Sequence, residues 1–203
     1  ALGWVEYRLP WVKLLNDSVG TNYPTPRNLN YWWNFGSLAG LALVIEILTG
    51  IVLNMHYVPT AEGAFDSVQH IMRNVNNGWL LRYVHSNGAS MFFAAVYIHM
   101  FRAHYYGSYK APREINFWFG IILLQLVLGL SLTGYLLPWD QKGYWATKVA
   151  TDILGSTPLI GEWLKQLVLG GSDYGHHTLT RFFALHAGIL PLAVIGLTVG
   201  HIY

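Results

Sequence analysis

The sequence of 203 residues contains no cysteine, and charged residues make up only 11% of it, against about 25% in an ordinary soluble domain. The missing cysteine excludes a disulfide-stapled module and a cysteine-ligated zinc or iron–sulfur site. A formal net charge of +2 gives no basic surface for nucleic acid. Apolar residues are abundant, at 53%, and there are nine histidines. The composition is therefore that of a membrane protein with histidines available for chemistry.

Four apolar stretches are long enough to cross a membrane, since a hydrocarbon core of about 30 Å needs about 20 helical residues. They cover residues 32–57, 79–104, 115–137 and 182–203. Four antiparallel spans place both ends of this sequence at one membrane face, called side 1 below; the opposite face is side 2. We predict an all-α membrane protein, a four-transmembrane-helix bundle that forms a single domain over residues 1–203.

Three shorter segments are expected to lie at the membrane surface. Residues 3–20 mix apolar and charged side chains, which favours an interfacial helix; a soluble capping helix is the alternative. The long third connection, on side 2, contains two amphipathic stretches at residues 140–154 and 159–169. A structured connection of this length usually has a function.

Four of the histidines lie inside two of the predicted spans at similar intervals. His85 and His99 are fourteen residues apart, and His186 and His201 are fifteen apart. Fourteen residues are close to four helical turns, or about 21 Å. Since both spans run from side 2 to side 1, His85 should lie level with His186, and His99 with His201. The extra residue in the last span turns His201 about 60° away, unless Pro191 introduces a kink or bulge.

Two imidazoles at each of two depths are what a pair of bis-histidine haems needs, because imidazole nitrogens bind iron from both faces of the macrocycle. The alternative is a proton or metal relay of intramembrane histidines.

Glycines on the other two spans favour haem over a relay. Gly36 and Gly50 are fourteen residues apart, and so are Gly120 and Gly134. By span direction, Gly50 and Gly134 should lie at the depth of His85, and Gly36 and Gly120 at the depth of His99. Glycine lets a flat macrocycle approach a helix backbone. Helix packing alone does not readily explain four glycines at these matched positions.

Two arginines are placed in the same way relative to the two histidines of the second span. Arg82 and Arg102 each lie three residues from a histidine, one turn nearer the water. Haem propionates would emerge there and could accept charge-assisted hydrogen bonds. The alternative for each is an arginine that extends to the membrane surface.

Together these residues resemble cytochrome b of the quinol-oxidising cytochrome bc complexes, both the bc1 and the b6f type. The resemblance covers nearly the whole chain from about Tyr23. It rests on Trp32-Trp33-Asn34-Phe35-Gly36, Leu48-Thr49-Gly50, Asn87-Gly88-Ala89-Ser90, Tyr105-Tyr106-Gly107-Ser108, Gly134-Tyr135-Leu136-Leu137-Pro138-Trp139 and Thr178-Leu179-Thr180-Arg181-Phe182-Phe183.

The resemblance implies two non-covalent b-type haems. The low-potential haem would be held by His85 and His186, and the high-potential haem by His99 and His201. Cofactor binding would further involve the arginines, the glycines and two polar residues: Arg82, Arg102, Gly36, Gly50, Gly120, Gly134, Ser108 and Asn34. Part of a quinol-oxidation site on side 2 would be formed by Tyr135, Gly143, Tyr144 and Trp145.

The family also implies a function. The chain would be a subunit of a quinol:cytochrome c, or plastocyanin-type acceptor, oxidoreductase. Quinol would be oxidised at the positive face, and electrons would pass through both haems to quinone at the negative face, coupled to proton translocation. Expected partners are a Rieske-type iron–sulfur protein, a c-type cytochrome, the C-terminal half of cytochrome b (a separate subunit or a continuation of this chain) and a second copy of the complex.

Orientation and location follow only in part from charge. Six Lys and Arg residues fall on each side, which leaves orientation open, but Arg102, Lys110 and Arg113 cluster in the short side 1 loop and favour side 1 as cytoplasmic. We expect a multi-pass protein of a bacterial inner membrane, with its N-terminus on the cytoplasmic side.

Two positions depart from the family pattern. Asn34 stands where b6f proteins attach a third haem through cysteine, so no covalent haem is expected. Glu46 stands where a neutral amide is expected; burial in the membrane favours its protonated form, and a role in a proton path is the alternative.

Two other functions remain open on the sequence. One is a di-haem, quinone-reactive membrane anchor of another oxidoreductase. The other is a haem-free transporter with a histidine relay, which would be colourless.

Overall fold

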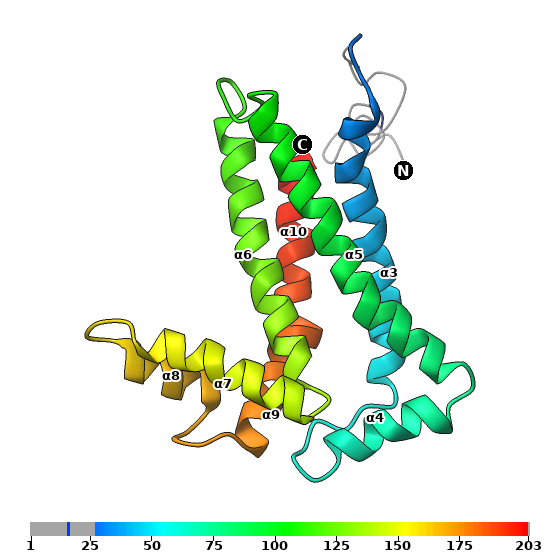
Figure 1. Cartoon of the computed structure of the whole chain (residues 1–203), viewed down its shortest axis with the longest axis vertical. Coiled ribbons are helices and arrows are strands. Elements are labelled where there is room, and N and C mark those ends of the chain that lie inside the picture. Colours follow the sequence, from blue (N-terminus) through cyan, green and yellow to red (C-terminus); the bar gives the residue numbers. More distant parts are fainter. Residues whose placement is uncertain (1–15, 17–26, 203) are drawn as a thin grey trace, which may run out of the picture.

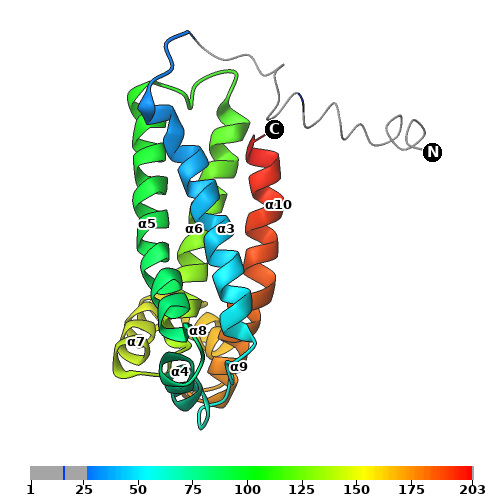
Figure 2. The same ribbon diagram turned by 90° about the vertical axis from the view of Figure 1, so that its right-hand side faces the viewer.

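The structure, a computed structural model, describes residue 16 and residues 27–202, and over these residues it is all-helical. Four long helical segments lie side by side (Figures 1 and 2). They are α3 (Phe35–Asn54), preceded by the short 3-10 helix η1 (Tyr31–Asn34); α5 (Gly78–Tyr105); α6 (Glu114–Leu136); and the segment formed by α9 (His176–Ala184), the π-helical η2 (Leu185–Ile189) and α10 (Leu190–Ile202).

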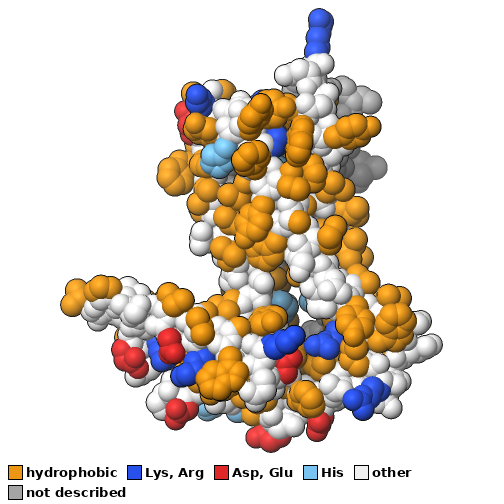
Figure 3. Space-filling view, viewed as in Figure 1, with side chains coloured by type: hydrophobic (Ala, Val, Ile, Leu, Met, Phe, Trp, Pro, Cys, Tyr) orange, Lys and Arg blue, Asp and Glu red, His pale blue; other side chains and the backbone are white. Residues whose placement is uncertain are grey.

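Three of these segments are long and apolar enough to cross a membrane: Tyr31–Asn54, Glu114–Leu136 and His176–Ile202. The remaining one, α5, has 28 residues, about 42 Å of helix, but is less apolar because it carries several histidines and arginines. It packs along the length of α3, so it lies at the same depth. Apolar side chains cover much of the outer surface of the bundle (Figure 3), which suits a lipid environment. On α3 the exposed ones include Leu38, Leu41, Val44, Leu48 and Ile51.

The segments pack as two pairs. Helix α3 lies against α5, and α6 lies against α10, more closely than either pair lies against the other. The shorter helices gather at the end that corresponds to side 2 (Figure 1): α4 (Ala64–Arg73), α7 (Gln141–Gly155), α8 (Gly161–Leu169) and α9.

The best-buried apolar cluster lies at this side 2 end, not in the middle of the bundle. Ala64 of α4, Leu136 of α6, and Leu179 and Phe182 of α9 are fully buried there. The hydroxyl of Tyr57 donates to the carbonyl oxygen of Leu137 at 2.7 Å, which ties the end of the first long helix to the end of α6. The side 2 helices thus form a cap on the bundle.

Local chemistry explains where the cap helices begin and end. Asp140 caps α7, because its side chain accepts a hydrogen bond from the Gly143 amide at 2.8 Å. Gly170 ends α8 with φ +84°, a conformation that glycine adopts without strain. Helices α7 and α8 are joined by Lys165 and Asp152 at 2.6 Å, and this hydrogen bond lowers the pKa of Asp152.

The last long segment contains a bulge near the residue predicted to cause one. Residues 185–189 are π-helical, and Pro191 follows after Leu190. A π turn accommodates one extra residue, and proline lacks the amide hydrogen that a regular helix would use there. The expected kink or bulge is therefore confirmed, and it brings the fifteen-residue histidine interval back into phase.

The helices differ from the sequence prediction mainly in two places. The last long segment begins at His176, six residues before the predicted 182, because η2 continues directly from α9. Helix α4 was not predicted, although Ala64, Val68 and Ile71 lie on one buried face at helical spacing. The predicted interfacial helix at residues 3–20 lies outside the described residues except for Asn16, which is helical.

A buried hydroxyl should hold α8 and α9 together. The Thr178 side chain is fully buried; its oxygen donates to the Leu169 carbonyl at 2.9 Å and accepts from the Gly175 amide at 3.2 Å. Thr178→Val keeps the shape but leaves both partners unpaired, so we expect a loss of about 1–3 kcal/mol in unfolding free energy. Thr180→Val, which removes bonds only within its own helix, is the control. Thermal unfolding in detergent measures both, and equal midpoints would contradict this role.

Candidate functional site

The structure brings His85 and His186 together near side 2. Their ring centroids are 6.1 Å apart, with the ring planes at 86° to each other. His85 comes from α5, and His186 comes from the π-helical segment across the bundle. The two rings thus face each other between the two helix pairs at this depth.

A second pair has the same form near side 1. The ring centroids of His99 and His201 are also 6.1 Å apart, with the planes at 74°. Helix geometry puts the two pairs about 21 Å apart along the bundle. All four histidines are half-buried.

The glycines of α3 lie directly behind the histidines of α5. A Cβ atom at Gly36 would lie 3.0 Å from Cε1 of His99, and one at Gly50 would lie 3.1 Å from Cε1 of His85. Both distances are tighter than ordinary van der Waals contact, so a side chain at either position would displace an imidazole.

The glycines of α6 stand in the same relation to the other two histidines. A Cβ at Gly120 would lie 3.2 Å from Cε1 of His201, and one at Gly134 would collide with the ring of His186. Each of the four glycines therefore faces a different one of the four histidines, at the depth that the fourteen-residue intervals predict.

Hydrogen bonds fix the orientation of two of the rings. Nδ1 of His186 lies 2.8 Å from the Leu130 carbonyl oxygen, and Nδ1 of His201 lies 3.0 Å from that of Asn116. Because a carbonyl only accepts, Nδ1 carries the hydrogen in both rings. The lone pair is then on Nε2, as in histidines that bind metal through that nitrogen.

This arrangement fits a haem at each pair. Two metal–nitrogen bonds of about 2 Å each, plus the distance from each nitrogen to its ring centroid, add up to roughly the observed 6.1 Å. Among the described residues, no three His, Cys, Asp or Glu side chains converge to hold a metal ion. Haem needs only two protein ligands, because the macrocycle supplies the rest.

Arg102 lies beside the side 1 pair. Its Nη2 is 3.4 Å from Nδ1 of His99, its guanidinium carbon is 5.5 Å from the Trp33 ring centroid, and its Nε is buried without a hydrogen-bond partner among the described residues. A buried guanidinium nitrogen without a partner suits an anionic group such as a propionate. A recess of about 270 Å³ adjoins it, lined by Trp32, Phe101, Arg102, Tyr105 and Tyr106.

Three other residues that were predicted to take part in cofactor binding have no hydrogen bond to the histidine pairs within the described part of the chain. Arg82 is half-buried one turn before His85 in α5, and no hydrogen bond or ion pair joins it to another described side chain. Asn34 precedes α3 and accepts a hydrogen bond from Ser37 at its carbonyl oxygen. Ser108 lies in the turn after α5, where its amide donates to Ala103. No hydrogen bond or ion pair between described residues joins any of the three to one of the four histidines.

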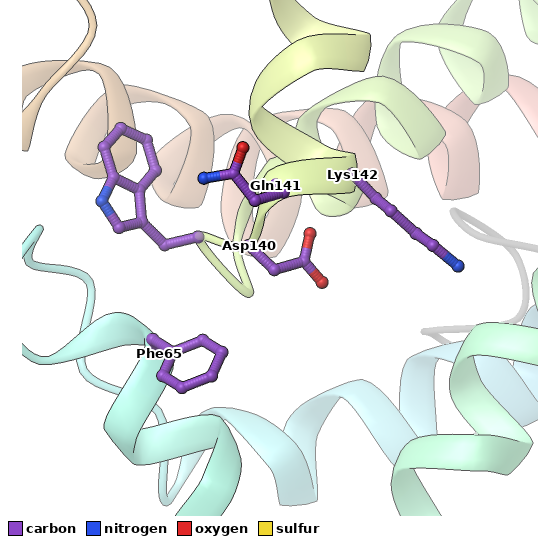
Figure 4. A pocket seen from close by; sticks show the side chains of 5 residues that line it. Phe65, Asp140, Gln141 and Lys142 are labelled. Carbon is purple, nitrogen blue, oxygen red and sulfur yellow. The ribbon is translucent and has the colours of Figure 1, made fainter.

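The residues predicted for quinol oxidation lie at side 2, where α6 leads into α7. Gly143 is buried, Tyr144 is half-buried, and Tyr135 and Trp145 are half-exposed. Beside them is an open recess of about 510 Å³, lined by Phe65, Trp139, Asp140, Gln141 and Lys142 (Figure 4).

Contacts link the predicted residues to this recess. The Trp145 indole donates to Gln141 at 2.8 Å, and Tyr144 packs edge-on against Trp139 with centroids 6.1 Å apart. Sequence reasoning missed Phe65 because α4 was not predicted. The sequence analysis included Trp139 in a family motif and residues 140–154 in an amphipathic stretch, but it did not assign Trp139, Asp140, Gln141 or Lys142 to the site.

Known proteins match this chain over nearly its whole length. The family profile described as "Cytochrome b/b6/petB" matches residues 20–203. The chain belongs to the cytochrome b/b6 family. It is 51% identical to a cytochrome b of Rickettsia conorii over 98% of its length and 47% identical to one of Rhodospirillum rubrum over all of it. The resemblance drawn from the sequence motifs is therefore confirmed.

The fold matches a solved structure as well. A chain of a hyperthermophilic respiratory Complex III covers the whole of this chain, with a TM-score of 0.86 and 34% sequence identity. The chain spans about half the length of the relatives it matches: 49% and 50% of the two cytochromes b, and 54% of the Complex III chain.

The glycine contacts predict a selective effect on one of the two histidine pairs. A methyl group at Gly134 would collide with His186, whereas one at Gly40 of α3 meets no atom within 4 Å. We expect Gly134→Ala to cost about 1–3 kcal/mol at the side 2 site through overpacking and to lower haem occupancy there. Gly40→Ala should leave the protein unchanged. Visible difference spectra of the two variants test this; equal loss in both would contradict it.

Proposed function

We propose that this chain carries electrons across a membrane through two b-type haems, as part of a quinol-oxidising cytochrome bc complex. The observation that carries the proposal is the pair of histidine pairs, each with centroids 6.1 Å apart and each backed by two glycines. A proton or metal relay of histidines has no need for glycines at these positions.

Haem supplies one-electron redox chemistry when it is bound. His85 and His186 would hold one haem, and His99 and His201 the other. The Nδ1 hydrogen bonds of His186 and His201 to backbone carbonyls keep Nε2 available and the ring planes fixed. Gly36, Gly50, Gly120 and Gly134 would provide the room that the ligands and macrocycles need. Arg82 and Arg102 would meet the propionates; only Arg102 has a buried nitrogen without a partner.

The two ends of the bundle would serve different reactions. Under this proposal side 2 is the positive face, where quinol is oxidised, and side 1 is the negative face, where quinone is reduced; proton translocation follows from this separation. The side 2 recess beside Trp139 and Gln141 supports a site there, together with Tyr135, Gly143, Tyr144 and Trp145. Arg102 also supports a higher potential at side 1, because a nearby cation stabilises the reduced state.

The proposed complex includes further subunits. A Rieske-type iron–sulfur protein and a c-type cytochrome would accept electrons at side 2, and the C-terminal half of cytochrome b would complete the quinol site. Each complex would pair with a second copy. We place it in a bacterial inner membrane, consistent with the bacterial relatives, with the N-terminal side cytoplasmic and no covalently attached haem.

Removal of one ligand at a time tests the proposal. We expect His85→Ala to abolish the side 2 haem and to leave most of the side 1 haem, and His99→Ala to do the reverse, because the two pairs share no residue. Reduced-minus-oxidised spectra of the intact complex, with pyridine extraction to count haems, measure this. The unaltered chain should hold two extractable b-type haems, and either a colourless complex or a histidine variant with both haems would refute the assignment.

The position of Arg102 predicts that its removal changes the midpoint potential of the side 1 haem. Since the guanidinium lies 3.4 Å from His99, Arg102→Gln should lower the midpoint potential of the side 1 haem by removing a positive charge at low dielectric. Lys110→Gln, which removes an exposed charge from the loop that follows α5 at the same end of the bundle, is the control. A redox titration monitored by absorbance measures both variants; equal potentials in the two would count against this role of Arg102.

A further inference from the structure

Glu46 is a carboxylate in the middle of the apolar helix α3. One of its oxygens, Oε2, lies 3.0 Å from Nδ1 of His85. The other, Oε1, is buried and has no hydrogen-bond partner among the described residues. A carboxyl group at this depth costs free energy, and such residues inside a membrane usually have a function.

Thr49 approaches the same nitrogen from the next turn of α3. Its hydroxyl oxygen is buried and lies 3.0 Å from Nδ1 of His85. The hydroxyl hydrogen is directed to the Ile45 carbonyl at 2.7 Å, so the oxygen faces His85 as an acceptor. With two acceptors beside it, Nδ1 of His85 carries the hydrogen, and Nε2 is left with the lone pair.

Helix α5 is shaped to admit the carboxyl group. A Cβ atom at Gly88 would collide with Oε1 of Glu46. Gly88 is three residues after His85, so the two lie on the same helical face. The same face of α5 therefore supplies the hydrogen-bond donor and the space for the acceptor.

His85 is unlike the other three histidines in this respect. His186 and His201 donate to backbone carbonyls of α6, and His99 has the Arg102 guanidinium near Nδ1. Within the described part of the chain, His85 alone of the four has side-chain acceptors, and both of them come from α3.

From these contacts we infer that Glu46, assisted by Thr49, is the positioning residue for His85. It fixes the tautomer and the ring plane of the imidazole and strengthens its electron donation through Nε2. Hydrogen-bond acceptors behind a metal-binding histidine act in this way in other proteins. The inference rests on the proposed function, because it requires that His85 hold the side 2 haem. It gives Glu46 a role other than carrying protons.

Two substitutions separate the hydrogen bond from packing. Glu46→Gln keeps a carbonyl oxygen that can face Nδ1, whereas Glu46→Leu fills a similar volume without an acceptor. Gln125→Leu, at an exposed polar position within α6, is a matched control for placing leucine in a membrane span. Each variant is made in the intact complex in its membrane.

The readouts are the low-spin electron paramagnetic resonance signal and the midpoint potential of each haem. We expect Glu46→Leu to shift the side 2 signal and to raise the potential of that haem, since a weaker donor favours the reduced iron. In Glu46→Gln the signal and potential of the side 2 haem should stay close to those of the unaltered protein. The signal and potential of the side 1 haem should not change in any variant. Gln125→Leu should leave both haems unchanged.

The results distinguish failure of this inference from failure of the proposed function. If both haems are present and Glu46→Leu leaves the side 2 signal and potential unchanged, or if Glu46→Gln shifts them as much, the inference is overturned. If the unaltered complex has no haem that depends on His85, the proposed function fails instead. Should Glu46→Leu not assemble, Gly88→Ala displaces the carboxyl group from the other helix; an unchanged side 2 signal in that variant also overturns the inference.

Discussion

The close approach of a helix backbone to an imidazole is the constraint on which this structure depends. At four places a glycine of α3 or α6 faces a histidine of α5, η2 or α10, and at each of them an added Cβ would press on the ring. These contacts set the separation within each helix pair. The histidine rings lie between the two helix pairs, and the centroids of facing rings are 6.1 Å apart at both depths. The bundle is thus spaced by its polar sites, and its best-packed apolar cluster lies in the side 2 cap.

The two sites share a plan but differ in what surrounds the ligands. Near side 2, His85 is held by Glu46 and Thr49, which are acceptors. Near side 1, the cationic Arg102 stands beside His99. Acceptors and cations act on a metal site in opposite directions. Under the proposed function, two histidine pairs of the same kind could therefore give their haems different potentials, as a directional path for electrons would require.

Much of the arrangement of histidines and glycines could be predicted from their spacing in the sequence. In a helix, the spacing between two residues determines both their difference in depth and whether they lie on the same face. The fourteen-residue spacing of Gly36 and Gly50 was enough to match them with His99 and His85. The position of the π turn was less certain, since Pro191 allows either a kink or a bulge. Helix α4 was missed because it is short and lies outside the spans. The contact between Glu46 and His85 depends on the relative rotation of α3 and α5, which spacing within one helix does not give.

The most direct test of the central claim is an experimental density map of the intact complex, at a resolution that separates side chains. The account predicts flat density between His85 and His186, and again between His99 and His201, with Nε2 of each ring directed at its centre. It also predicts that the edges of this density pass close to the four glycines. Imidazole pairs in direct contact, or separated only by water, would contradict it.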